Sequence, residues 1–157
     1  MGTNKKRRDG QKSGLAGEFF VAAELLKRDY QVSLTLGNAK AVDLFVQRTE
    51  DSQPTTVQVK TLRSPNCYLI RSSDVHRDHI YVFVLLHKPS EPVEYFVVAG
   101  SELCEKRFEV WGKDGGEKAF AGITIGRIRQ FKDKWTIFEH DRKLANKALH
   151  RPRIRDR

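Results

Sequence analysis

The chain has 157 residues, of which 39% are hydrophobic and 31% are charged, a composition typical of one soluble globular domain. No apolar run approaches the roughly 18 residues of a membrane helix, and the charged start MGTNKKRRDG lacks the apolar stretch of a secretory signal. Two cysteines, Cys67 and Cys104, offer neither a disulfide framework nor a zinc-ligand spacing, so we expect a reducing, cytoplasmic setting.

The net charge of +9 is concentrated at the two ends of the chain. Residues 1–12 and 141–157 together hold 12 of the 29 Lys and Arg but three of the 20 Asp and Glu, so the intervening body is neutral. We therefore expect a basic, disordered arm over residues 1–12, one domain over 13–140 and a basic tail over 141–157. Basic ends on a neutral body are typical of phosphate binding, although solvated tails that only aid solubility are the alternative.

A helix is expected after Ser13, which is a candidate N-cap, and it ends near Tyr30. Its apolar residues recur at helical spacing and predict the face that packs on the core. They are Leu15, Phe19, Ala22, Ala23 and Leu26. Glu18 lies at the edge of that face, where the ordinary explanation is an acid favoured by the helix dipole in the first turn.

The rest of the chain is expected to form strands and a few short helices. Alternating apolar residues predict strands over 30–36, 41–48, 55–62, 68–71 and 95–99, and the continuous run at 80–87 predicts a strand buried on both faces. Short helices are expected at 100–106 and 128–134 and a closing strand at 135–138, whereas the pattern from 108 to 126 is weak. We therefore expect an α/β domain with a mixed sheet of four or five strands, helix first. Because that core is small for this length, a homodimer is expected.

The strands at 41–48 and 55–62 flank a polar turn and are expected to form a hairpin. A symmetric hairpin about Asp51 and Ser52 sets Asp43 opposite Lys60, with Gln58 on the same face of the sheet. Together with Glu18, these residues would offer two carboxylates, an amide oxygen and an ammonium. Such a set suits Mg²⁺ and the metal-assisted hydrolysis of a phosphodiester, although each residue also has an ordinary role in a turn or on a surface.

The ordered set of GE at 17–18, Asp43 at the start of a strand and QVK at 58–60 resembles the PD-(D/E)xK nuclease superfamily, which includes restriction endonucleases and Holliday-junction resolvases. The resemblance covers about residues 13–100. It implies a restriction-endonuclease-like core and an endonuclease that cuts DNA with Mg²⁺, for which Mn²⁺ substitutes.

The resemblance also implies a role for each site residue. Asp43 is the principal metal ligand, Gln58 takes the place of the second acid, the backbone carbonyl of Val59 is a further ligand, Lys60 is the catalytic lysine, and Glu18 assists the metal. Because Gln58 replaces an acid, a non-catalytic nucleic-acid-binding module on the same fold is the alternative.

DNA is the expected partner, and neither a membrane nor a small-molecule cofactor is expected. The expected DNA contacts are Lys5, Lys6, Arg7, Arg8, Thr61, Arg63, Arg71, Arg151 and Arg153, with Tyr68 and Arg127 as further candidates for a groove. The pair His76 and His79 has a spacing that suits a metal, but polar loop residues are the alternative. His87, at the end of the apolar run, is expected to be a hydrogen-bonded histidine at the edge of the core.

Overall fold

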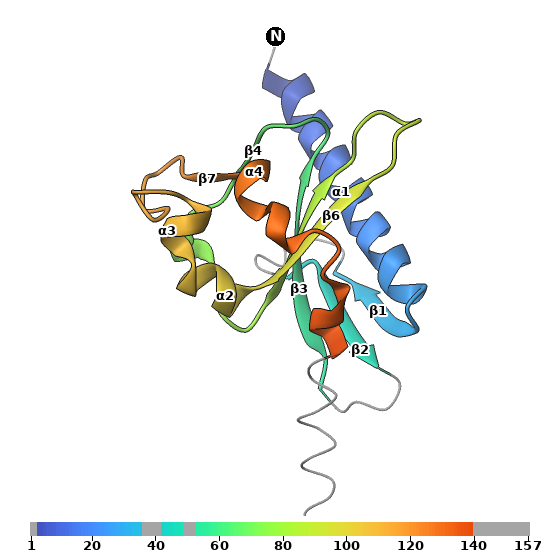
Figure 1. The fold of residues 1–157 in the computed structure, drawn as a ribbon. Helices are drawn as coiled ribbons and strands as arrows, with labels where there is room; N and C mark the ends of the chain where they lie inside the picture. The colour runs from blue at the N-terminus through green and yellow to red at the C-terminus, as the bar shows by residue number, and fades with distance from the viewer. Residues whose placement is uncertain (1–2, 36–41, 49–52, 140–157) are drawn as a thin grey trace, which may run out of the picture.

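The structure is a computed structural model that describes residues 3–35, 42–48 and 53–139, with side chains from Gly10 onward. A mixed five-stranded sheet in the order β1-β2-β3-β5-β6 runs through its centre (Figure 1). The strands are β1 (Tyr30–Leu34), β2 (Leu44–Arg48), β3 (Thr55–Leu62), β5 (Ile80–Leu85) and β6 (Glu94–Ala99). Neighbouring strands are antiparallel except β3 and β5, which are parallel. The α/β class and the mixed sheet are confirmed.

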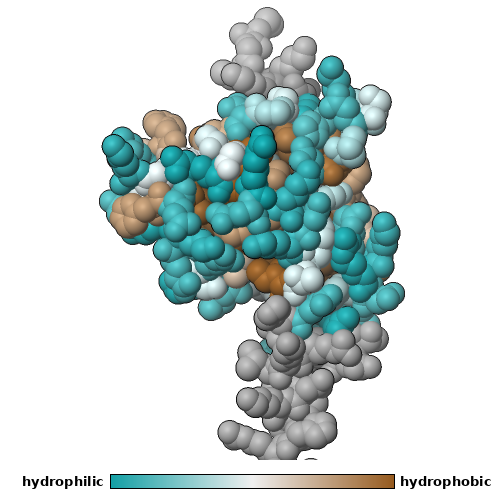
Figure 2. Space-filling view, in the orientation of Figure 1, coloured by the Kyte–Doolittle hydropathy of each residue, from teal (hydrophilic) through white to brown (hydrophobic). Residues whose placement is uncertain are grey.

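Helices and a second, smaller sheet cover the two faces of this sheet. Helix α1 (Thr3–Leu26) and the 3-10 helix η3 (Trp135–Glu139) pack on one face. The other face lies under α2 (Gly100–Glu105), α3 (Arg107–Val110), α4 (Ile125–Ile128), η2 (Arg129–Phe131) and the pair of β4 (Cys67–Leu69) with β7 (Gly122–Thr124). The surface over α2 to α4 is mostly hydrophilic (Figure 2), and the apolar side chains on this face form a second hydrophobic core beneath it.

Strand β5 lies between two hydrophobic cores and confirms the expectation that it is buried on both faces. Side chains alternate across a strand, so Val82 and Val84 enter the core beneath α1. Tyr81 and Phe83 enter the core beneath α2 and α4, and all six residues of β5 are buried. The sheet is therefore anchored at β5, next to the strand that carries Gln58 and Lys60.

Helix α1 differs from expectation in both its start and its buried face. It begins at Thr3, before the expected start at Ser13, because Lys and Arg are good helix formers and let the helix extend past the sheet. Leu15, Phe19 and Leu26 are exposed, at 44%, 53% and 56%. Of the expected apolar residues only Ala22 is buried, and the other buried positions are Ser13, Gly17, Val21 and Leu25. Since α1 has apolar residues on two sides, periodicity alone selected the wrong one.

The expected closing strand at 135–138 is also wrong, because η3 occupies it. Trp135 and Phe138 are both buried against the first core, where Trp135 packs edge-on against Tyr95 with ring centroids 5.3 Å apart. Residues three apart share one side of a helix but opposite faces of a strand, so only a helical turn buries both rings. The 141–157 tail lies outside the described residues.

The described residues also bear on the expectations about the two cysteines and about a membrane-spanning helix. Cys67 and Cys104 are free thiols. No helix in the described ranges combines the length and the hydropathy that crossing a membrane requires.

Candidate active site

The pairing of β2 with β3 decides which predicted site residues meet. Leu44 is opposite Val57 and Phe45 is opposite Thr56, so the register is shifted by two residues from the symmetric hairpin. Asp43 directly precedes β2 and lies outside this ladder; its amide bonds to the Val57 carbonyl, so Asp43 lies beside Val57 rather than opposite Lys60. Gln58 and Lys60 are two residues apart on β3 and so share one face of the sheet, the face opposite to Val57, Val59 and Thr61, on which α1 packs.

Asp43 is fixed at the point where the β2–β3 ladder ends. Its amide donates a hydrogen bond to the Val57 carbonyl (3.0 Å), and its own carbonyl accepts one from the Thr35 amide (3.0 Å). The Val59 amide donates to Asp43 Oδ2 at 2.7 Å, so the side chain takes the place of the next strand residue. Since the N–H and C=O of one strand residue point the same way, the Val59 carbonyl faces the same gap between the strands.

Gln58, the residue of β3 before Val59, carries an unpaired oxygen. Its Oε1 is buried and has no hydrogen-bond partner among the described residues. A buried amide oxygen without a partner costs about 1–3 kcal/mol, so it is rare unless something else satisfies it. A hard cation is one group that accepts such an oxygen as a ligand.

Glu18 reaches the site from α1, and a glycine sets its distance. A Cβ on Gly17 would lie 1.9 Å from Thr61 Oγ1, so only glycine lets α1 lie this close to β3. Burial and then the negative charge of Asp43 raise the pKa of the Glu18 carboxyl above its ordinary value of 4.5. The two carboxylates are thus near enough to repel each other in the absence of a cation.

Lys60 lies two residues beyond Gln58 on β3, opposite Phe83 of β5. Its ammonium is near Asp74, because it contributes to lowering the pKa of that carboxyl; the larger cause is the hydrogen bond from Arg71. Arg71 binds Asp74 in a two-point geometry, with Nε and Nη2 at 2.9 and 2.8 Å from the two oxygens. Asp74 was not predicted as a site residue, since nothing in its polar loop distinguishes it in the sequence.

The donor set suits a small divalent cation. Asp43 Oδ2 and the Val59 carbonyl lie at the same gap between β2 and β3, and Glu18 on α1 is near enough to Asp43 for that charge to add to the effect of burial on the Glu18 pKa. Gln58 Oε1 is a further hard oxygen with no partner among the described residues, and its side chain leaves β3 on the face opposite to α1. A cation bound at Asp43 would relieve its repulsion with Glu18. No group of three or more His, Cys, Asp or Glu side chains forms a metal cluster in the described part of the chain, so any site here depends on the amide and carbonyl oxygens.

The predicted DNA contacts have different outcomes. Thr61 is corrected, because its Oγ1 is buried against Gly17 and offers no surface to a phosphate. Arg63 is exposed and donates from Nε to Ser13 Oγ at 3.2 Å, while Arg71 is half exposed and paired with Asp74. The backbone of Lys5, Lys6, Arg7 and Arg8 is helical, whereas Arg151 and Arg153 lie outside the described residues.

The two groove candidates also differ. Tyr68 is buried in the second core and is corrected. Arg127 is exposed and donates from Nη1 to the Glu109 carbonyl at 2.6 Å.

The three histidines that the structure describes, His76, His79 and His87, belong to no metal-binding cluster. The rings of His76 and His79 stack with centroids 4.8 Å apart, and burial followed by the neighbouring His76 lowers the pKa of His79. His87 Nε2 lies 2.8 Å from Glu94 Oε1, which confirms a hydrogen-bonded histidine at the edge of the core. Two surface hollows of about 420 and 350 Å³ lie within residues 107–122 and contain none of the predicted site residues. A phosphodiester in DNA is reached at a surface, so the site near Asp43 needs no enclosed cavity.

No protein-family model and no curated protein sequence matches the chain.

Proposed function

We propose that the chain is a Mg²⁺-dependent endonuclease that hydrolyses DNA phosphodiesters, on a core of the PD-(D/E)xK type. The observation that carries the proposal is the oxygen set around the end of β2. Asp43 accepts from the Val59 amide at 2.7 Å, the buried Gln58 oxygen has no partner among the described residues, and burial followed by the charge of Asp43 raises the pKa of Glu18.

Asp43, Gln58, the Val59 carbonyl and Glu18 would hold the ion, with Mn²⁺ as a substitute. When bound, it would supply Lewis-acid activation of the phosphate and of the attacking water. Asp43 is held in one orientation by the Val59 amide, so its free oxygen is directed without reorganisation. Because its pKa is raised, Glu18 holds its proton more tightly than an ordinary glutamate does. A bound cation would compensate the negative charge of Asp43, and Glu18 would then lose its proton and bind the cation as a carboxylate.

Lys60 supplies the fixed positive charge of the site. An ammonium beside the scissile phosphate stabilises the negative charge that develops on its oxygens during in-line attack. Asp74, held by the two-point contact with Arg71, carries a carboxyl whose pKa is lowered mainly by that contact and least by the charge of Lys60, so we give it no role in the reaction.

Phosphate contacts away from the reaction centre would come from the N-terminal turns of α1 and from Arg63. Gly10 and Gly14 have open space around them, which indicates that α1 extends past the sheet beyond Ser13. At a rise of about 1.5 Å per residue, Lys6 lies roughly 18 Å along the helix from Glu18. Contacts at that distance fix the register of the duplex without reading its sequence.

Cleavage assays on supercoiled, linear and branched DNA with Mg²⁺ or Mn²⁺ test the proposal. We expect Asp43→Ala to abolish cutting and Lys60→Ala to slow it by about 10²–10³-fold, whereas the exposed controls Glu109→Ala and Lys113→Ala retain the wild-type rate. Cutting that survives both site changes would rule out this site. Salt-dependent DNA binding without cutting under either metal would instead identify a non-catalytic module, which the amide at Gln58 in place of an acid favours.

A further inference from the structure

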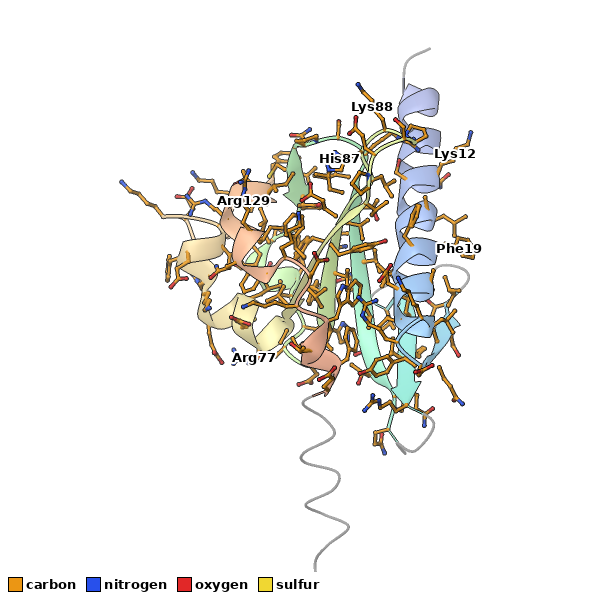
Figure 3. All side chains as sticks on the ribbon, turned by 45° about the vertical axis from the view of Figure 1, so that its right-hand side comes forward. Lys12, Phe19, Arg77, His87, Lys88 and Arg129 are labelled. Atoms are coloured by element: carbon orange, nitrogen blue, oxygen red, sulfur yellow. The ribbon has the colours of Figure 1, made fainter. Side chains whose placement is uncertain are left out.

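One face of β1, β2 and β3 points away from α1, and Phe45 lies near its centre. The apolar residues of these strands alternate into the core beneath α1, so the residues between them point the other way. They are Gln31, Ser33, Phe45, Gln47, Thr56, Gln58 and Lys60. Within the described ranges the second core takes no residue from β1 or β2, and Figure 3 shows its helices, with Arg129, at the opposite end of the sheet. Phe45 is 39% exposed on this face.

The residues beside Phe45 leave its ring prominent. In the strand register Phe45 lies opposite Ser33 of β1 and Thr56 of β3, both of which are small and carry a hydroxyl. No other aromatic ring of the described residues stacks on it. Lys60 is the only charged residue on this face of the three strands as they are described. An aromatic ring among hydroxyls and amides, with a cation and without an acid, suits a nucleobase joined to a phosphate.

The same face carries two residues of the proposed site. Gln58 is the diagonal neighbour of Phe45 across the β2–β3 ladder, at about 7–8 Å, and Lys60 follows two residues later on β3. Phe45 itself is two residues beyond Asp43, a rise of about 7 Å along the strand. A base resting on Phe45 would therefore belong to the nucleotide that carries or adjoins a phosphate held by Asp43 and Lys60.

We propose that Phe45 stacks on the base of an unpaired nucleotide next to the scissile phosphate, so that the substrate is DNA that is single-stranded where it is cut. This inference rests on the proposed function and names the class of DNA that the site accepts. Inside a duplex both faces of a base are covered by its stacking neighbours, so a ring on a sheet reaches a base face only where the strand is unpaired. Phe45 is thus a substrate-binding residue that determines specificity.

Fluorescence anisotropy with a labelled oligothymidine and a blunt duplex of equal length tests the proposal. EDTA in the buffer keeps the DNA uncut. The wild type should bind the single strand more tightly, and Phe45→Ala should weaken that binding by about 5- to 150-fold with little change for the duplex. Phe45→Trp keeps a stacking ring and should retain the affinity, whereas Phe45→Leu keeps apolar volume alone and should lose it. Phe19→Ala is the matched control, because Phe19 is 53% exposed and projects from α1 away from the sheet (Figure 3).

Two results would overturn the proposal. A wild type that binds the single strand no more tightly than the duplex excludes it. Wild-type affinity in Phe45→Leu would show that the site needs apolar volume and not a stacking ring, a comparison that holds even if Phe45→Ala lowers the melting temperature. Single-strand binding that depends on Phe45, in a chain that cuts no DNA with Mg²⁺ or Mn²⁺, would support the stacking while removing the proposed nuclease activity. Cutting that depends on Asp43 in a chain indifferent to Phe45→Ala would do the reverse.

Discussion

The sharpest consequence of the packing concerns Gly17, which lets α1 lie against β3 and brings Glu18 to the site. A Cβ there would lie 1.9 Å from Thr61 Oγ1 and 3.0 Å from both Thr61 Cβ and Cγ2. Rotation of Thr61 about χ1 would only move Cγ2 into the place of Oγ1, and a β-branched residue in a strand has few other rotamers, so rotation does not relieve the clash. The Gly17→Ala variant must therefore push the helix away from the strand.

Two opposing contributions set the size of the effect. Alanine in place of glycine stabilises a helix interior by about 0.5–1 kcal/mol. Overpacking a tight contact costs about 1–3 kcal/mol. We therefore expect Gly17→Ala to lower the free energy of unfolding by about 1–2 kcal/mol in urea denaturation. Gly14→Ala is the control, because nothing lies within 4 Å of its Cβ, and it should be stabilising.

Thr61→Ala removes both Oγ1 and Cγ2 from the contact, so it should rescue Gly17→Ala in the double variant. The same displacement of α1 should weaken Mn²⁺ binding, measured by calorimetry, because Glu18 moves with the helix. If Gly17→Ala is as stabilising as Gly14→Ala, or if Thr61→Ala rescues neither stability nor Mn²⁺ binding, the close approach of α1 to β3 is not what sets the site.

Three further predictions concern the oxygens and the lysine of the site. Glu18 has a raised pKa, so the folded state binds its proton more tightly than the unfolded state does. The stability of the metal-free protein should therefore fall as the pH rises above about 4.5. Thermal melts at several pH values should show this fall in the wild type and not in Glu18→Gln. Gln58→Met removes a buried oxygen without a protein partner, so the metal-free protein should gain about 1 kcal/mol in urea denaturation while its stabilisation by Mn²⁺ disappears. Lys60→Ala should lower the cleavage rate by about 10²–10³-fold with Mn²⁺ affinity unchanged in calorimetry, and a parallel loss of affinity would contradict its role as a separate cation.

The local sequence pattern predicted those strands in which every residue follows a single rule, either alternation of apolar and polar residues or continuous apolarity. The bounds of β3 agree with expectation, and β5 begins where expected, because alternation or continuous apolarity extends over their full length. The segment from 108 to 126 has no such pattern. There β7 pairs with β4, and Trp111 Nε1 donates to the Ile70 carbonyl at 2.8 Å. Contacts between residues distant in the sequence define these short elements, so no local rule reveals them.

The sequence suggested which residues form the candidate site, and their roles stay predictions, but it did not predict how β2 and β3 pair. The shift of two residues between them depends on the connecting turn, which the symmetric hairpin only approximated. Asp43 lies outside the ladder and bonds to Val57 and Val59, which alternation alone could not predict. The role of Gly17 was not predictable, since it follows from a contact across the fold.

A crystal structure of the chain soaked in Mn²⁺ tests the metal site most directly. We predict an anomalous peak in the gap beyond β2, about 2 Å from an Asp43 oxygen, Gln58 Oε1 and the Val59 carbonyl, with Glu18 bound directly or through water. A fully soaked crystal with no peak there, or with Gln58 Oε1 bonded to a protein donor instead, would contradict a metal site at this position.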